Sequence, residues 1–343
     1  MRRRKFSRPI NVLSVTGCAL AMLCCALAGC GNVVNSVVAG PSSSSSSASA
    51  AVSIGPQLGY LWDAADNTLR PVLGVPGSAQ FGQAVTMAGA YVNGAASARS
   101  SMAVLQSASG AVSVMAVPAG SPQVLSGASV SGTAQIVFSP SGLNAVLYTP
   151  GAASLLLVTG LNTTAQAQSL TAPSGFLAAT VSDSAQVAAA YGSGPVSVAL
   201  LTGNHGTVGA LTGFGGFSFL PGGSDILLAD SGSGVVTVVR SAATAPAAQS
   251  FTSAAIQSPL AVGGSADGRW AVVANGADAS VVRLDLSGAT QPLRIACACQ
   301  PAQLLPMTGN AVFSLTPPGT VASWVADASA TTPRTVFIPA VQP

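Results

Sequence analysis

Residues 264–275 read GSADGRWAVVAN, and residues 280–285 read SVVRLD. The first segment opens with a turn that contains Gly268 and continues as a run of strand-forming residues from 270 to 274. A second turn and a second strand-forming run follow. Glycine permits the positive φ that tight hairpins require, and short apolar runs broken by turn residues are typical of buried strands. The stretch therefore predicts two short strands, each introduced by a tight turn.

The same order of turn, strand, turn and strand recurs along the chain. In five clear copies the equivalent turn residues are 43, 38, 45 and 41 positions apart, and two more degraded copies lie near residues 59 and 100. Seven copies over residues 55–343 give about 41 residues each, which is the length of a propeller blade built from four strands. The turn residues of the five clear copies are Gly142, Ala185, Gly223, Gly268 and Gly309.

Residues 264–285 resemble a YVTN or WD40-like propeller repeat. In those families a Ser-Pro-Asp-Gly turn leads into a strand, an Asn, and a second strand that ends in Asp. Here Asn275 and Asp285 stand at the last two of these places, and the turn at residues 139–142 is also similar. The other copies depart from the pattern. The resemblance implies a divergent propeller of the lactonase-like superfamily.

We therefore predict an all-β fold, a β-propeller of seven blades of about 40 residues each, over residues 55–343. Alternating small and β-branched residues let stacked blades bury both faces of each sheet, and burial contributes roughly 25 cal/mol per Å² of apolar surface. A β-solenoid and tandem β-sandwiches are the alternatives. The nearly constant period disfavours the sandwiches.

The first 30 residues have the features of an export signal. A basic start (Arg2 to Arg8) precedes an apolar stretch (Ile10 to Leu27), as in secretory signals. Residues 27–30, Leu-Ala-Gly-Cys, resemble the lipobox of bacterial lipoproteins. The resemblance implies that residues 1–29 are a lipoprotein signal peptide and that Cys30 becomes an N-terminus carrying acyl chains such as palmitate. An uncleaved anchor helix is the alternative.

Residues 30–54 are predicted to be a flexible tether. Six consecutive serines at residues 42–47 dominate this segment, and such stretches bury too little apolar surface to offset the entropy of ordering. Two or more acyl chains anchor a protein stably, so we expect a location in the cell envelope. Gly31 follows the cysteine, and the absence of Asp at this place favours the outer membrane in a Gram-negative cell.

Charge is scarce after the signal. Beyond residue 8 the chain has seven Arg, nine Asp, no Lys and no Glu, which is a formal net charge of −2. Binding of nucleic acid requires a basic footprint of Lys and Arg, so the sequence argues against that class. Although 49% of the residues are hydrophobic, no apolar run after residue 40 approaches the ~20 residues of a membrane span.

Cys297 and Cys299 form the most unusual local motif. Residues i and i+2 of a strand face the same side, and neighbouring thiols in an oxidising envelope tend to pair. A short-loop disulfide and two buried small side chains are the structural interpretations. Redox activity and binding of a soft metal such as Cu(I) are the others. Both need neighbours that stabilise a thiolate, and only Arg294 is near in sequence.

Other reactive side chains are few, and we predict no catalytic residue, metal site or cofactor. His205, the single histidine, lies in a Gly-rich turn, and one His with two Cys does not supply a zinc site. The acidic turns around Asp63, Asp66 and Asn67 and around Asn275 and Asp278 offer oxygen ligands to Ca²⁺, but hairpin turns alone explain them. Blade packing is the simpler role for three tryptophans, and sugar stacking is the alternative; they are Trp62, Trp270 and Trp324.

These features favour a membrane-tethered envelope lipoprotein whose propeller is a non-enzymatic binding or scaffold module. The expected partners are the membrane, through the lipid, and an envelope protein or a glycan. A lactonase-like hydrolase is the first alternative, although such sites are expected to gather several acidic, His or Arg side chains at the central channel. A surface glycan-binding or adhesin module is the second.

Overall fold

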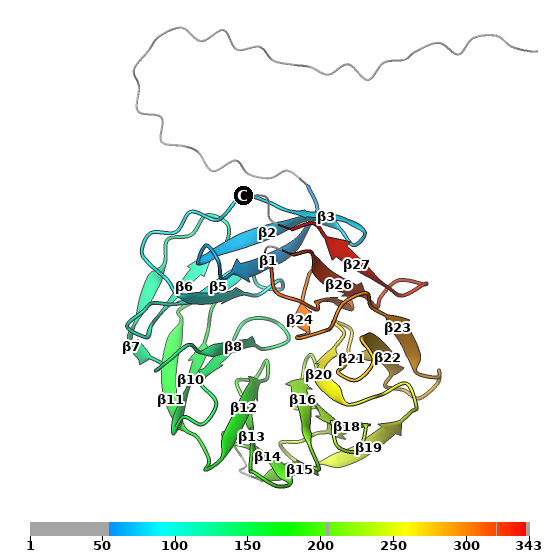
Figure 1. The fold of residues 1–343 in the computed structure, drawn as a ribbon. Helices are drawn as coiled ribbons and strands as arrows, with labels where there is room; N and C mark the ends of the chain where they lie inside the picture. The colour runs from blue at the N-terminus through cyan, green and yellow to red at the C-terminus, as the bar shows by residue number, and fades with distance from the viewer. Residues whose placement is uncertain (1–54, 204–205, 320, 341–343) are drawn as a thin grey trace, which may run out of the picture. The chain divides into compact units, whose positions relative to one another are not determined.

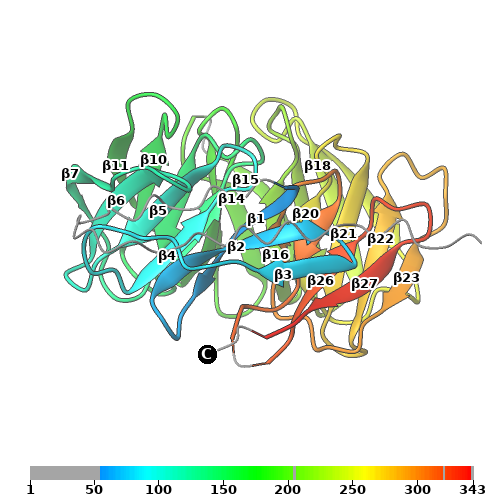
Figure 2. The ribbon, with the colours of Figure 1, turned by 90° about the horizontal axis from the view of Figure 1, so that it is seen from above.

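The computed structural model describes residues 55–203, 206–319 and 321–340. These residues form strands and no helix, and the strands make seven antiparallel sheets. The sheets follow one another around a central axis like the blades of a propeller (Figures 1 and 2). The predicted fold, an all-β propeller of seven blades, is confirmed. No membrane-spanning helix is present in this part of the chain. The predicted signal peptide (residues 1–29), Cys30 and the predicted tether (residues 30–54) lie outside the described residues.

Each sheet is built from a continuous stretch of chain, and we number the sheets 1 to 7 in chain order. Among the described residues, sheet 1 has three strands and each of the others has four. The strands of sheets 1 to 3 are β1 (Gln57–Asp63), β2 (Thr68–Val75), β3 (Ser78–Phe81); β4 (Asn93–Ala96), β5 (Met102–Gln106), β6 (Ala111–Ala116), β7 (Gln123–Ser129); β8 (Gln135–Phe138), β9 (Ala145–Tyr148), β10 (Ser154–Thr159) and β11 (Gln166–Thr171).

The remaining four sheets repeat the same order of strands. Their strands are β12 (Phe176–Val181), β13 (Val187–Tyr191), β14 (Val196–Leu200), β15 (Thr207–Leu211); β16 (Phe214–Phe219), β17 (Ile226–Asp230), β18 (Val235–Arg240), β19 (Ala247–Thr252); β20 (Pro259–Gly264), β21 (Trp270–Asn275), β22 (Ser280–Asp285), β23 (Leu293–Ala296); β24 (Leu305–Pro306), β25 (Val312–Ser314), β26 (Ser323–Asp327) and β27 (Arg334–Ile338).

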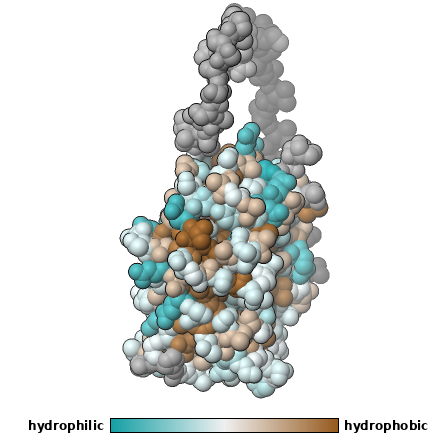
Figure 3. Space-filling view, turned by 90° about the vertical axis from the view of Figure 1, so that its left-hand side faces the viewer, coloured by the Kyte–Doolittle hydropathy of each residue, from teal (hydrophilic) through white to brown (hydrophobic). Residues whose placement is uncertain are grey.

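The apolar core lies between adjacent sheets. In β17, Ile226 and Leu228 pack into the cluster shared with sheet 4, whereas Leu227 packs into the cluster shared with sheet 6. Successive side chains of a strand point to opposite faces, so a strand that is buried on both faces reads as an unbroken apolar run. The outermost strands, such as β19, are largely exposed. Figure 3 shows few strongly hydrophilic residues on the side of the ring that carries β7 and β11.

In several sheets, the turn that follows the first strand contains a residue with a left-handed backbone conformation. Gly142, Ala185, Gly268 and Gly309 have positive φ, as the repeat predicts. In sheet 5 the residue with positive φ is Gly222 rather than the aligned Gly223. The left-handed residue of that turn therefore lies one position earlier than the sequence alignment places it.

Sheets 1 and 7 close the ring through side-chain and backbone contacts. No sheet combines strands from both ends of the described chain. The Thr308 N–H donates to the Leu58 carbonyl at 2.7 Å, and Arg334 donates to the Pro76 carbonyl at 3.0 Å. A cluster that includes Leu58, Met307 and Ile338 fills the space between the two sheets.

Candidate functional site: the central cavity

A cavity of about 480 Å³ lies where the first strands of the seven sheets meet. β8, β12, β16, β20 and β24 surround the centre in Figure 1. Residues of these strands, of β4 and of β1 line the cavity, together with parts of the turns that follow them. Since all seven sheets contribute, its shape is fixed by the ring as a whole.

Small and apolar groups dominate the lining. Glycines at positions such as 94, 216 and 263 leave the space open and let neighbouring side chains approach the backbone. A Cβ on Gly94 would lie 2.7 Å from the Trp62 ring, and a Cβ on Gly263 would lie 2.8 Å from the Phe313 ring. Glycine at these positions is therefore a requirement of packing between sheets.

Arg99 is the one charged residue among the described residues that line the cavity. It follows β4, and its Nη2 donates to the Gly309 carbonyl at 2.9 Å. Burial lowers the pKa of Arg99 from its ordinary value, but a guanidinium stays protonated at neutral pH. No carboxylate lines the described cavity, so Arg99 gives it a positive rim.

The turns after the first strands form one face of the ring, which we call the turn face (residues 97–101, 139–144, 182–186, 220–225, 265–269 and 307–311). The Asp183 carboxylate accepts backbone N–H groups of Ser141 at 2.7 Å and Gly222 at 3.1 Å, so it joins sheets 3, 4 and 5. Burial opposes ionisation of Asp183, but these hydrogen bonds outweigh it and hold the pKa below the ordinary value.

A matching pair joins sheets 6 and 7 on the same face. Asn310 Nδ2 donates to Asp267 Oδ2 at 2.8 Å, and the Asp267 N–H donates to Asn310 Oδ1 at 3.0 Å. Side chains of one turn thus hold the backbone of the next around much of the ring. Hydrogen bonds therefore join neighbouring turns of the turn face.

β1 runs in the opposite direction to the other first strands. Its beginning lies among the turns of sheets 7 and 2, because Leu58 accepts the N–H of Thr308, and a Cβ on Gly59 would lie 3.3 Å from that of Ala98. In sheets 2 to 7 the first strand ends at the turn face and the second strand begins there. β1 begins at the turn face, so it runs in the direction of a second strand. Sheet 1 therefore lacks the innermost strand in the described chain.

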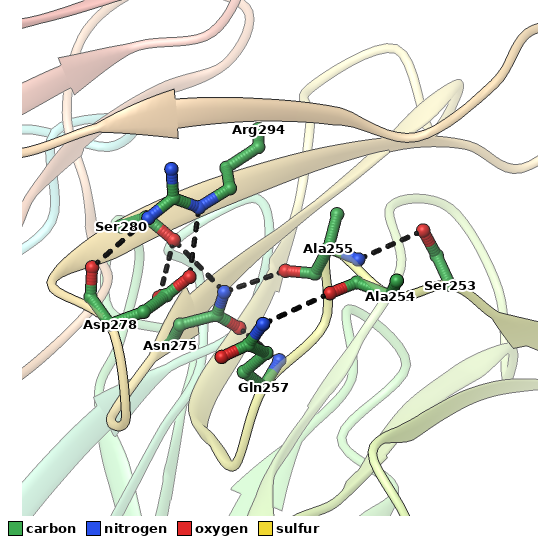
Figure 4. A network of polar contacts seen from close by, with 8 residues as sticks. All are labelled: Ser253, Ala254, Ala255, Gln257, Asn275, Asp278, Ser280 and Arg294. Atoms are coloured by element: carbon green, nitrogen blue, oxygen red, sulfur yellow. Dashed lines mark hydrogen bonds and ion pairs between the residues drawn. The ribbon is translucent and has the colours of Figure 1, made fainter.

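In sheets 5 and 6, the side chain at the end of the second strand hydrogen-bonds to the segment that leads into the first strand of the same sheet. Asn275 Nδ2 donates to the Ala255 carbonyl at 2.7 Å, and Asn275 Oδ1 accepts the Gln257 N–H at 3.0 Å (Figure 4). In sheet 5, Asp230 accepts the N–H groups of Thr212 and Gly213, both at 2.9 Å.

Asp63 holds the corresponding place in sheet 1 but has different partners. Its Oδ2 accepts Arg70 Nε at 2.7 Å, and its Oδ1 accepts the Ala65 N–H at 3.1 Å. In sheets 5 and 6, the segment held by Asp230 or Asn275 leads into the innermost strand of the sheet. The different partners of Asp63 agree with the absence of that strand from the described part of sheet 1.

The acidic turns considered as calcium ligands are occupied by arginine. Asp63 and Asp66 both pair with Arg70. Asp278 pairs with Arg294 at 2.8 Å and accepts the Ser280 hydroxyl at 2.6 Å (Figure 4). Asn67 has φ +51°, which suits a hairpin turn. The described residues contain no cluster of three or more His, Cys, Asp or Glu side chains placed to hold a metal.

Cys297 and Cys299 are joined as a disulfide at the end of β23, with sulfurs 2.02 Å apart. Cys297 is buried, and both residues contact the cluster between sheets 6 and 7. The guanidinium of Arg294 binds Asp278. Neither cysteine lines the cavity. His205 lies outside the described residues.

Each tryptophan has a distinct environment. Trp62 lines the cavity. The guanidinium groups of Arg269 and Arg283 both lie over the Trp270 ring, each 4.4 Å from its centroid. Trp324 packs beside Phe337, with ring centroids 6.1 Å apart, and Phe337 is 58% exposed.

Arg99, Asp183 and Asp267 were not predicted from the sequence as contact residues. One signal was available, because the joined residues lie about one repeat apart. Ser141 and Asp183 are separated by 42 positions, and Asp267 and Asn310 by 43. A repeat that predicts adjacent blades also predicts that residues one period apart are neighbours.

No protein-family model and no curated protein matches the sequence. Solved structures do match. A functionally unknown protein from Desulfotomaculum acetoxidans has a TM-score of 0.58 at 12% identity, over 83% of this chain and 100% of its own. A streptogramin B lyase has a TM-score of 0.52 at 11% identity, over 80% and 87%. The β-propeller domain of Cps50 (Swd1) from Myceliophteria thermophila has a TM-score of 0.52 at 10% identity, over 75% and 89%. These likenesses show the propeller fold.

Proposed function

We propose that the protein is an envelope lipoprotein, anchored through acylated Cys30, whose propeller is a non-enzymatic module that binds another envelope protein. The lipobox-like residues 27–30 support the anchor, and Gly31 favours the outer membrane. Residues 264–285 support a divergent relationship to the YVTN-type propellers. The serine-rich segment then separates the ring from the bilayer.

The hydrogen-bonded turn face supports the binding part of the proposal. Asp183, Asp267 and Asn310 fix the backbone of neighbouring turns, so a partner meets a surface that is already ordered. Binding to a preorganised surface avoids much of the entropic cost of ordering it. The cavity lining of small, apolar and neutral polar groups with a single Arg99 also suits binding better than hydrolysis, which needs positioned acid–base groups.

Photo-cross-linking in the native host tests the partner. Lysine-reactive reagents are unsuitable because the chain has no Lys beyond residue 5. A photo-reactive residue replaces exposed Thr308 on the turn face, and a matched variant replaces exposed Gln249 on β19. We expect one envelope protein to be captured in near-stoichiometric amount from position 308 and not from position 249. Failure at position 308, with efficient capture in a known complex, would overturn the proposal.

The anchor has its own test. Cys30→Ala removes the acylated thiol and is expected to abolish palmitate labelling and to release the protein from the membrane fraction. Cys299→Ala, which changes a cysteine inside the ring, serves as the control and is expected to stay membrane-bound. Equal labelling of the two variants would contradict lipidation at Cys30.

Exposed aromatic rings favour glycan binding as a second candidate. Phe337 is 58% exposed and packs beside Trp324, so the pair offers a stacking surface at the outer edge of sheet 7. On a glycan array, Phe337→Ala should lose any signal of the parent protein, whereas Val321→Ala, which removes another exposed apolar residue, should keep it. An array on which the parent protein gives no signal would argue against this candidate.

A further inference from the structure

The two ends of the central cavity differ in charge. The innermost strands of sheets 2 to 7 end at the turn face, where Arg99 and Ser139 are part of the lining. At the opposite end, where these strands begin, the lining includes the neutral amides Asn93, Gln135 and Gln303. The cavity therefore has a positive group at the turn face and neutral polar groups at its other end.

The guanidinium of Arg99 is able to bind an anion. A guanidinium has five N–H donors, and among the described residues it makes a single hydrogen bond, from Nη2 to the Gly309 carbonyl. Asp183 and Asp267 lie on the same face but do not line the cavity, and their carboxylates accept hydrogen bonds from neighbouring turns. The planar fork of an arginine matches a carboxylate, which it binds through two parallel hydrogen bonds.

Aromatic rings from three sheets line the cavity. They are Trp62 of β1, Phe138 of β8 and Phe217 of β16. None of the three is fully buried, although their strands surround the centre of the ring. The volume of about 480 Å³ is typical of small-molecule sites, in which apolar walls hold the body of the ligand and a few polar groups orient it.

We propose that the cavity binds a small organic acid whose ring-containing, apolar body packs against Trp62, Phe138 and Phe217 and whose carboxylate pairs with Arg99. A monocarboxylate fits best, because a second carboxylate would lose its water without gaining a cationic partner among the described lining residues. A cationic ligand would meet Arg99 and no carboxylate in that lining. This site depends on neither the lipid anchor nor the protein partner proposed above.

Isothermal titration calorimetry of the full-length chain tests the proposal with two probes of the same shape. Naphthalene-2-carboxylate carries the acid, and naphthalene-2-carboxamide is its neutral counterpart. We expect the carboxylate to bind with a stoichiometry of one and the amide to bind about tenfold more weakly or less tightly still. No binding of either probe at concentrations up to about 1 mM, or equal affinities for the two probes, would overturn the proposal.

Substitution of Arg99 separates recognition of the charge from packing of the ring. Arg99→Gln should reduce the affinity for the carboxylate to that for the amide and leave binding of the amide unchanged, which also shows that the cavity is intact. Arg99→Lys should retain part of the preference for the acid. Arg240→Gln, which changes an arginine of sheet 5 outside the cavity, is the matched control. A preference for the acid that persists in Arg99→Gln would overturn the assignment.

Nuclear magnetic resonance locates the bound probe independently of affinity. Ile136 lines the cavity, whereas Ile256 lies in the apolar cluster between sheets 5 and 6. With isoleucine methyl groups labelled, we expect nuclear Overhauser effects from the naphthalene protons to Ile136 and none to Ile256. Effects at Ile256 without Ile136 would place the probe outside the cavity and overturn the proposal. Capture of a partner from position 308 is measured separately, so failure of one proposal is distinguishable from failure of the other.

Discussion

Arg99 joins two sheets that are not neighbours in the ring. Its guanidinium in sheet 2 donates to the Gly309 carbonyl in sheet 7 at 2.9 Å, across 210 positions of sequence and past the three-stranded sheet 1. β1 occupies the place of a second strand, so no first strand and turn of sheet 1 are described between sheets 7 and 2. The turns of sheets 2 and 7 therefore approach each other, and the contact forms. Arg99 thus holds the ring together at its seam.

Loss of this contact should weaken the seam. Arg99→Ala removes one hydrogen bond to a carbonyl, and we expect a loss of about 1 kcal/mol in the free energy of unfolding, measured by chemical denaturation. The double variant Arg99→Ala/Arg334→Ala removes both arginine contacts of sheet 7 at the seam and should speed amide exchange in β1 and β27. Arg240→Ala, within sheet 5, is the control and should leave exchange at the seam unchanged.

Asp230 should make the fold sensitive to acid. Burial raises its pKa, but the hydrogen bonds from Thr212 and Gly213 outweigh burial and hold the pKa well below the ordinary value. A lowered pKa stabilises the fold above the pKa of the unfolded chain, about 3.9, and this contribution is lost as the pH falls toward the folded pKa. Asp230→Asn should cost about 2 kcal/mol at pH 7 and flatten the dependence of stability below pH 4.

The equivalent residue of sheet 6 provides the reciprocal test. Asn275→Asp replaces a donor to the Ala255 carbonyl with a carboxylate, so it should destabilise the fold at pH 7 and recover stability as the new carboxyl becomes protonated. Thermal melts from pH 3 to 7 compare the two variants. Parallel pH profiles for both variants would contradict these assignments.

Replacement of Ala185 by glycine should stabilise the fold. This residue has φ +60°, where glycine carries no Cβ penalty. Ala185→Gly should therefore raise the free energy of unfolding by about 0.5–1 kcal/mol. The matched variant Gly268→Ala has φ +68° and open space at its Cβ, so it should lose a similar amount through backbone strain alone. A destabilised Ala185→Gly would show that packing of the Ala185 methyl outweighs strain.

The disulfide should contribute modestly to stability. Cys297 and Cys299 close a loop of three residues, and loop-closure entropy for so short a loop is worth about 1.5 kcal/mol. We expect Cys297→Ser/Cys299→Ser to lower the unfolding free energy by about that amount in denaturant titrations under oxidising conditions. Under reducing conditions the unfolding free energies of the parent protein and the double variant should differ less. Rapid alkylation of native, unreduced protein would instead favour a free thiol pair.

The repeat made the propeller predictable from the sequence. Second and third strands such as β21 and β22 read as apolar runs bounded by glycine turns, because both faces of each sheet are buried. The innermost strands were harder to predict. β4 and β24 have the sequences Asn-Gly-Ala-Ala and Leu-Pro, in which neither period nor propensity signals a strand. In β4, the space that a side chain would take at Gly94 is filled by Trp62 and Leu105.

The candidate site was less predictable than the fold. Arg99 donates to a backbone carbonyl of another blade, and Asp183 accepts backbone N–H groups of other blades. A backbone donor or acceptor leaves no mark in the sequence at its own position. The charged turn at Asp278, by contrast, was correctly assigned to a hairpin. Its partner Arg294 is close in sequence, so local reasoning was sufficient there.

The contiguity of each sheet has a consequence for how the chain folds. Every blade consists of one unbroken stretch, so most native contacts connect residues within two successive repeats and the contact order stays low for so long a β protein. Blades can form one after another along the chain, each using its predecessor as a template. Only the contacts between sheets 1 and 7 require the last repeat, so these contacts form in the final step of folding.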